Sequence, residues 1–377
     1  MTGLLCIRFN LRHARVDIAL LIGLIPLVLS PQRQNAFLYY LEFPCGRFGV
    51  FMYPVTQACG PVPSRNRQLR AHRRVAHRPS GANPQPRALM VSIFYPTSKF
   101  AVHSGNYPLS RYMSSQTAAA LPQYLGTSGV AARVLTGSYI DSPPITNSED
   151  EDDDSGSPVL IFSHGLNSSR LLHTAHLEQL ASRGWTVVAV DHTYDAAAVE
   201  FPDGRVVPWR PTNLDDFPNE LAGLIAVRVA DIEFVAQALG NSSEAPFRLD
   251  RVGIFGHSLG GATAAQVLAN SDPSTEPSWP EFWDHLGGFR REFTVNGTLH
   301  SAFSDLPVLR DLLGDAFPSA EKEQLGSIAG QRLLEIDTAF MHAFFTFCLK
   351  GGPSGDLDHL AQGMFPEVTI PQYEIIQ

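Results

Sequence analysis

The sequence predicts an α/β fold with a mostly parallel central sheet flanked by helices. Three short apolar segments carry this prediction, at 158–163 (PVLIFS), 185–190 (WTVVAV) and 251–255 (RVGIF). None of them alternates polar with apolar residues, which is typical of strands buried on both faces. Segments with helical spacing, 171–183 and 221–239, separate the three strands. Strands that alternate with helices in this way form a parallel sheet between two helical layers.

Length and composition narrow the class of protein. The chain has 377 residues, enough for one large α/β domain or two small ones. It is 44% hydrophobic and 17% charged, which is ordinary for a soluble globular protein. A net charge of −9 argues against a nucleic-acid partner, which usually requires a basic surface. The four cysteines form no CxxC pair, so we expect no zinc or redox site and no other metal or cofactor.

The chain divides into three expected parts: an N-terminal extension over 1–60, an irregular basic linker over 61–87 and the α/β domain over 88–377. In the extension, arginines precede an apolar segment at 18–29, a pattern typical of a secretory signal or a signal anchor. The segment is shorter than the ~20 apolar residues of a membrane-spanning helix. Two alternatives follow: a protein secreted or membrane-anchored through this segment, or a cytoplasmic protein with a disordered extension.

The motif Gly256-His257-Ser258-Leu259-Gly260 lies between the strand 251–255 and a helix of small residues, 261–270. A serine on such a strand-to-helix turn presents its hydroxyl at the carboxyl edge of the sheet, and the flanking glycines permit close backbone approach. This context indicates a nucleophile elbow. We therefore predict Ser258 as a catalytic nucleophile and an α/β-hydrolase fold. The alternative is a glycine-rich turn with a purely structural role.

A second motif, Ser163-His164-Gly165-Leu166, follows the strand 158–163. In this fold the loop at that place supplies one backbone N–H to an oxyanion hole, and the residue after the nucleophile supplies the other. The expected donors are the amides of Leu166 and Leu259. The side chain of His164 is expected to pack within the loop.

The histidine and the acid of a catalytic triad should follow the serine in the order Ser, Asp, His. Of the histidines after Ser258, only His300 lies at a strand end; the others are His285, His342 and His359. The acid is harder to find, because the short interval before His300 holds only Asp272 and Asp284 and no apolar strand that ends in aspartate. Asp272 is the better placed of the two. The pattern nevertheless favours a surface residue at the end of a helix over a triad acid at this position.

Four motifs in order resemble the platelet-activating-factor acetylhydrolase family, over about residues 87–347. They are FSHGL at 162–166, LASRGWTVVAVDHTYDAAAVEFPDG at 180–204, GHSLGGATA at 256–264 and VNGTLHSAFSD at 295–305. The resemblance implies a calcium-independent serine esterase of lipid catabolism. Its substrates would be phospholipids with a short or oxidised sn-2 acyl chain, such as 1-alkyl-2-acetylglycerophosphocholine. It also implies Ser258 as nucleophile, His300 as general base, and the amides of Leu166 and Leu259 as oxyanion donors.

The sequence departs from this family after the nucleophile helix. The chain passes from 268–270 almost directly to Pro277-Ser278-Trp279-Pro280, where members of the family have further strands and the triad aspartate. We expect one or two strands to be missing here, which would expose apolar surface beside the nucleophile strand or force a new pairing. Loss of the acid would lower the catalytic rate by roughly 10⁴. A catalytically impaired protein of this fold therefore stays an alternative to an active esterase.

The partners expected from these motifs are small molecules. They are a phospholipid or a simpler ester, met in solution or in transient contact with a lipid surface, and a general carboxylesterase or lipase is a further alternative. The sequence leaves the oligomeric state open.

Overall fold

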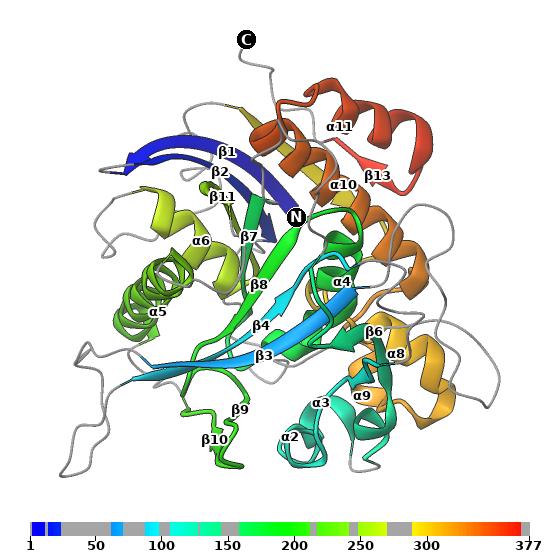
Figure 1. Ribbon diagram of the computed structural model, residues 1–377. Coiled ribbons are helices and arrows are strands. Elements are labelled where there is room, and N and C mark those ends of the chain that lie inside the picture. Colours follow the sequence, from blue (N-terminus) through cyan, green and yellow to red (C-terminus); the bar gives the residue numbers. More distant parts are fainter. Residues whose placement is uncertain are drawn as a thin grey trace.

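A computed structural model of the chain describes residues 2–11, 14–23, 62–70, 87–97, 106–126, 129–144, 158–211, 217–240, 248–269 and 289–370. Its centre is an eleven-stranded sheet with the strand order β13-β12-β1-β2-β11-β7-β8-β4-β3-β6-β5 (Figure 1). The strands are β1 (Thr2–Leu11), β2 (Ala14–Gly23), β3 (Val62–Arg70), β4 (Ala88–Phe94), β5 (Leu109–Arg111), β6 (Leu135–Ile140), β7 (Pro158–Ser163), β8 (Thr186–Asp191), β11 (Arg248–His257), β12 (Arg290–Val295) and β13 (Val368–Thr369). A separate hairpin joins β9 (Ala198–Glu200) to β10 (Val206–Pro208).

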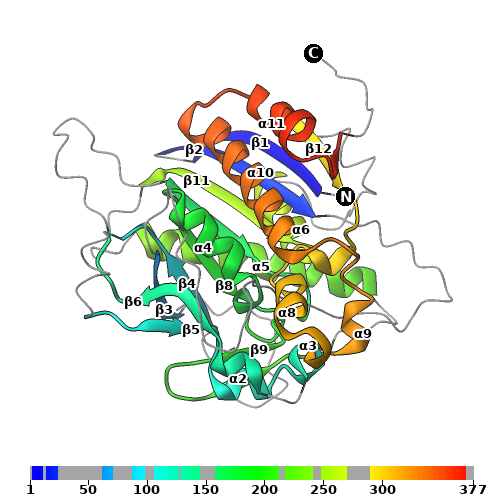
Figure 2. The same ribbon diagram turned by 90° about the vertical axis from the view of Figure 1, so that its right-hand side faces the viewer.

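The helices of the described residues fall into long covering helices and short connecting ones. They are α2 (Ser115–Ala119), α3 (Pro122–Leu125), α4 (Thr174–Ser182), α5 (Phe217–Gly240), α6 (Leu259–Ala269), α8 (Leu306–Leu313), α9 (Ser319–Lys322), α10 (Gly330–Lys350) and α11 (Gly355–His359). Helices α5 and α6 cover one face of the sheet, and α4 and α10 lie side by side on the other (Figures 1 and 2). None of the helices in these ranges combines the length and the apolarity needed to cross a membrane.

The strands at the centre of the sheet, β2, β11, β7 and β8, run parallel. Strand β7 shows why the prediction of a sheet covered on both faces is confirmed. Its residues Val159 and Ile161 pack in the core beneath α5 and α6, whereas Leu160 and Phe162 pack beneath α4 and α10. Successive side chains of a strand point to opposite faces. Because both faces are buried, the whole segment must be apolar.

The N-terminal residues enter the sheet beside the nucleophile strand. Strands β1 and β2 form an antiparallel hairpin between β11 and β12, and β2 pairs in parallel with β11 at Gly256↔Ile22 and His257↔Gly23 (Figure 1). The expected signal or anchor segment, 18–29, begins within β2, and residues 24–29 lie outside the described residues. Its role in targeting stays a prediction.

The expected irregular linker also contains a strand. Residues Val62–Arg70 form β3, which pairs antiparallel with β4 from Ser64 to Arg70. A ladder of backbone hydrogen bonds does not depend on apolar side chains, so this basic and polar segment gave no strand signal. Residues 270–288, where the departure from the family falls, lie outside the described residues.

Candidate active site

Ser258 occupies a strained turn between β11 and α6. Its φ of 54° lies in the left-handed region, which costs a residue other than glycine roughly 1–3 kcal/mol and is concentrated at functional sites. The flanking glycines have no room for a side chain. A Cβ on Gly256 would lie 2.3 Å from the carbonyl carbon of Gly260, and a Cβ on Gly260 would lie 1.9 Å from the carbonyl oxygen of Ser163. The serine itself is half-buried and therefore reachable from solvent.

Helix α6 starts directly after the serine. The carbonyl oxygen of Ser258 accepts hydrogen bonds from the amides of Gly261 (2.8 Å) and Ala262 (3.2 Å). Leu259 is the first residue of the helix, where an amide has no intrahelical partner. This amide also contributes to the positive end of the helix dipole, so it suits a developing negative charge.

The loop after β7 lies against this turn. A Cβ on Gly165 would lie 3.3 Å from Ser258 Cβ and 3.1 Å from His257 Nδ1. The next side chain, Leu166, packs in the same small apolar cluster as Leu259. In the described ranges, the amide of Leu166 makes no hydrogen bond to a backbone carbonyl. The two residues expected to supply oxyanion donors are thus brought together beside the serine.

His300 lies in a short turn that follows β12. Its ring contacts the ring of His257, with 4.8 Å between the centroids, and His257 Nε2–H donates to the carbonyl oxygen of His300 (2.9 Å). Burial, and then the neighbouring His257, lower the pKa of His300 to about 3. The imidazole is therefore neutral, as a general base must be. No hydrogen bond joins its ring to Ser258 among the described residues, and catalytic hydrogen bonds are often long without substrate.

No described carboxylate pairs with His300. The histidines that form ion pairs in the described part of the chain are His164, His176 and His192. Asp272, the acid expected from the sequence, lies outside the described residues, so its role stays a prediction.

The structure contains a second Ser–His–Asp string that the sequence did not indicate. Ser163 Oγ lies 2.9 Å from His192 Nε2, and His192 Nδ1 lies 2.9 Å from Asp231 Oδ2. Arg87 holds the pKa of Asp231 below its ordinary value, although burial acts in the opposite direction. Ser163 and His192 are 0% exposed, so no substrate can reach them. We interpret this string as structural support for the loop that starts at Ser163.

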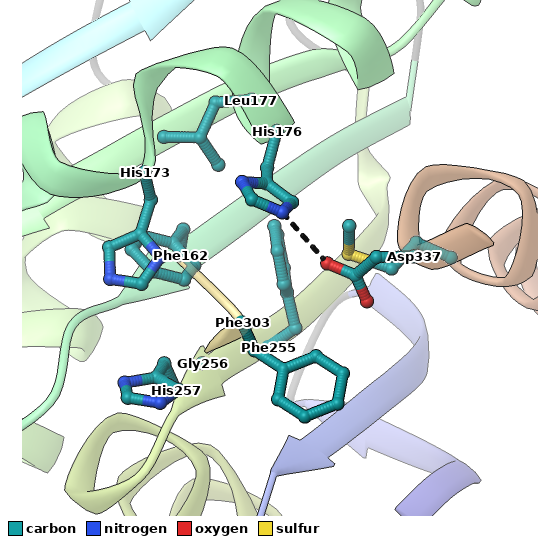
Figure 3. A pocket seen from close by; sticks show the side chains of 10 residues that line it. Phe162, His173, His176, Leu177, Phe255, Gly256, His257, Phe303 and Asp337 are labelled. Carbon is teal, nitrogen blue, oxygen red and sulfur yellow. Dashed lines mark ion pairs between the residues drawn. The ribbon is translucent and has the colours of Figure 1, made fainter. Parts of the chain in front are cut away.

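A cavity of about 30 Å³ lies behind the elbow, lined by Phe162, His173, His176, Leu177, Phe255, Gly256, His257, Phe303, Asp337 and Met341 (Figure 3). The ring of His176 is held between Asp305 (3.1 Å) and Asp337 (3.3 Å). Burial would lower the pKa of His176, but the hydrogen bond to Asp305 and the charge of Asp337 outweigh it and raise the pKa. The cavity is large enough for a water molecule. Among the described residues, no group of three or more His, Cys, Asp or Glu side chains has the geometry of a metal site.

The fold and the elbow define a carboxylic ester hydrolase of the α/β-hydrolase fold. The solved structure of a ferulic acid esterase from Streptomyces cinnamoneus is similar, with a TM-score of 0.70 and 29% sequence identity over 85% of this chain and 98% of that chain. Residues 79–202 match the protein-family model of platelet-activating factor acetylhydrolase, isoform II.

Curated relatives point to the same family. A probable 1-alkyl-2-acetylglycerophosphocholine esterase of Arthroderma benhamiae is 26% identical over 76% of this chain and 86% of its own length. The platelet-activating factor acetylhydrolase of Cavia porcellus is 33% identical over 30% of this chain and 32% of its own length. These similarities agree with the resemblance to the platelet-activating factor acetylhydrolase family that the sequence motifs indicated.

Proposed function

We propose that the chain is a serine esterase that hydrolyses the short or oxidised sn-2 acyl ester of phospholipids such as 1-alkyl-2-acetylglycerophosphocholine. The observation that carries the proposal is the left-handed turn at Ser258, packed against the loop that contains Leu166. The choice of substrate is supported by the name of the Arthroderma benhamiae relative, which matches most of both chains.

The proposed reaction proceeds through an acyl-enzyme. Ser258 Oγ attacks the acyl carbonyl carbon while His300 takes the hydroxyl proton, and the amides of Leu166 and Leu259 bind the oxyanion. The tetrahedral intermediate then expels the lysophospholipid alkoxide, which leaves with the proton from His300. His300 then deprotonates a water molecule, which attacks the acyl-serine. Ser258 Oγ leaves with the proton from His300, and the carboxylic acid is released. Each oxyanion donor contributes roughly 3 kcal/mol to transition-state binding.

A catalytic triad also needs an acid that orients the imidazole of His300. Asp272 is the proposed acid, and without one the rate should fall by roughly 10⁴. We also infer that the segment between α6 and β12 lacks one or two strands that the family has. This inference is supported by the hairpin β1–β2, which fills the sheet between β11 and β12.

Transient contact with a lipid surface is part of the proposal. Leu299, which directly precedes His300, is 48% exposed. An exposed apolar side chain at the edge of the site could bury itself among acyl chains when the substrate lies in a membrane or micelle.

Labelling with a fluorophosphonate tests the proposed nucleophile. Wild-type protein should become labelled and should release acetate from 1-alkyl-2-acetylglycerophosphocholine, and Ser258→Ala should abolish both signals. His300→Ala should remove turnover, whereas His359→Ala, at an exposed histidine in α11, should not. Folded wild-type protein that is neither labelled nor active would exclude the proposal and favour the catalytically impaired alternative.

A general carboxylesterase is the second candidate, favoured by the likeness to the ferulic acid esterase. Hydrolysis of methyl ferulate or long-chain esters faster than of the acetyl phospholipid would support this candidate over the first.

A further inference from the structure

The guanidinium of Arg228, in the middle of α5, is 0% exposed and binds the loop after β7. It donates to the carbonyl oxygens of His164 and Gly165, the latter at 3.2 Å, and its charge is paired with Asp195. Its Nη1 also lies 3.5 Å from Ser163 Oγ. Removing a charge from water is costly unless the charge is paired and hydrogen-bonded. The described partners of this buried cation either belong to the loop or, like Asp195, hold the loop in place.

The direction of these bonds fixes the direction of the loop amides. In a trans peptide the C=O and the following N–H point to opposite sides of the chain. Arg228 holds the carbonyls of His164 and Gly165 on its own side. The N–H groups of Gly165 and Leu166 are therefore directed away from Arg228. The same loop packs against the serine turn, since Ser258 Cβ lies 3.3 Å from the position of a Cβ on Gly165.

Other donors reinforce the orientation of the Gly165 carbonyl. His164 Nδ1–H donates to it at 2.6 Å and the amide of Ser168 at 3.3 Å. Asp195 ties the far end of the loop to the same anchor, because its carbonyl oxygen accepts the amide of Asn167 at 3.0 Å. The loop is thus held at both ends through one buried ion pair.

We propose that Arg228 is a positioning residue that directs the amide of Leu166 at the oxyanion of the substrate. This inference rests on the proposed function of Ser258 and deepens it. Arg228 does not touch the substrate; it acts through the backbone of the loop. Since oxyanion donors must be fixed before the reaction to be effective, loss of the guanidinium should weaken transition-state binding more than substrate binding.

The variants for the test are Arg228→Lys and Arg228→Met, with Arg170→Lys as a matched control. Arg170 is also buried and ion-paired, to Asp191, and donates to Ser92 Oγ at 2.8 Å, but in the described residues it does not bind the loop carbonyls. If Arg228→Met does not fold because Asp195 is left unpaired, the double variant Arg228→Met/Asp195→Asn removes both charges.

Three measurements distinguish positioning from a merely structural role. For 4-nitrophenyl acetate, Arg228→Met should lower kcat about 10²-fold, as loss of one oxyanion donor does, with KM changed less than twofold. A trifluoromethyl ketone forms a tetrahedral adduct with the serine, and its inhibition constant should rise by the same factor as kcat/KM falls. Amide hydrogen exchange in the peptide 163–168 should be at least tenfold faster in the ligand-free variant. Each value for Arg228→Lys should lie between those of the wild type and Arg228→Met, and Arg170→Lys should change each value less than threefold.

Unchanged amide exchange in Arg228→Met overturns the inference, whether or not the wild-type protein is active. Equal losses of kcat in Arg228→Met and Arg170→Lys overturn it as well. Wild-type protein that is neither labelled by a fluorophosphonate nor active removes the proposed function instead, and the exchange comparison then still decides whether Arg228 orders the loop.

Discussion

Replacement of Gly260 by alanine tests the packing that holds the serine turn against β7. The added Cβ would lie 1.9 Å from the carbonyl oxygen of Ser163, whereas ordinary contacts begin near 3.4 Å. The two backbone segments would have to separate by roughly 1.5 Å. Because these segments carry Ser258 and the loop after β7 with Leu166, the separation acts directly on the distance between the proposed nucleophile and the proposed oxyanion donor.

The expected loss follows from this distance. A misplacement of about 1 Å costs roughly 10²-fold in rate, so kcat of Gly260→Ala for 4-nitrophenyl acetate should fall 10²-fold or more. Overpacking a tight core costs about 1–3 kcal/mol, so the free energy of unfolding in urea should fall by a similar amount. The rate of fluorophosphonate labelling should fall together with kcat.

Gly223→Ala is the matched control. Gly223 lies in α5, and nothing lies within 4 Å of the position of its Cβ. Alanine there should leave kcat within twofold and should stabilise the protein by about 0.4–1 kcal/mol. A folded Gly260→Ala protein with the wild-type kcat would refute the assignment of this turn as a nucleophile elbow.

Three further predictions concern pH and packing. Burial raises the pKa of Glu178 to about 7 from 4.5. As the pH rises, Glu178 therefore ionises in the unfolded chain before it ionises in the folded protein, and the free energy of unfolding in urea should fall by about 3 kcal/mol between pH 4.5 and 7. The variant Glu178→Gln should remove this pH dependence. Because burial lowers the pKa of His300 to about 3, kcat/KM should stay constant from pH 8 to pH 5, and an acid limb near pH 6.5 would contradict this. The ring of Phe345 is fully buried and contacts Trp185 and Phe255, so Phe345→Ala should lower the free energy of unfolding in urea by about 3–5 kcal/mol. The control Leu312→Ala removes a 40% exposed side chain and should lower it by less than about 0.5 kcal/mol.

The parts of the fold that sequence predicts are those with a local signal. Strands β7 and β8 and residues 252–255 of β11 are apolar because helices cover both faces of the sheet there, so the parallel centre of the sheet could be predicted. The turn at Ser258 and the loop before Leu166 are also local, since each needs glycines at fixed positions beside its functional residue. Strand β3 could not be predicted, because its pairing with β4 depends on backbone groups that every residue except proline carries.

The hydrogen-bond network of Arg87, Asp231 and His192 could not be predicted either, but the reason is different. Arg87 and Asp231 are 144 positions apart, and the ring of His192 reaches Asp231 across 39 positions. Only the topology brings these residues together beneath the oxyanion loop. One weak signal was available for His192, which lies two positions after the predicted strand 185–190, at the carboxyl edge of the sheet where functional side chains gather in such folds.

The two strands beside β11 lead to different parts of the site. On one side, β7 pairs with β11 through six residue pairs, and Gly260 packs against its last residue, Ser163. On the other side, β2 pairs with β11 at Gly256 and His257, directly before Ser258. The loop after β7 is therefore held against the Ser258 turn from the β7 side. His300 follows β12, which joins the sheet through β1. In the described residues, the hydrogen bond from His257 to the His300 carbonyl joins the two halves. Because Ser258 is also held from the β7 side whereas His300 follows β12, disturbance of the N-terminal hairpin should displace His300, the proposed general base, more than Ser258. Turnover should then be lost before labelling of Ser258.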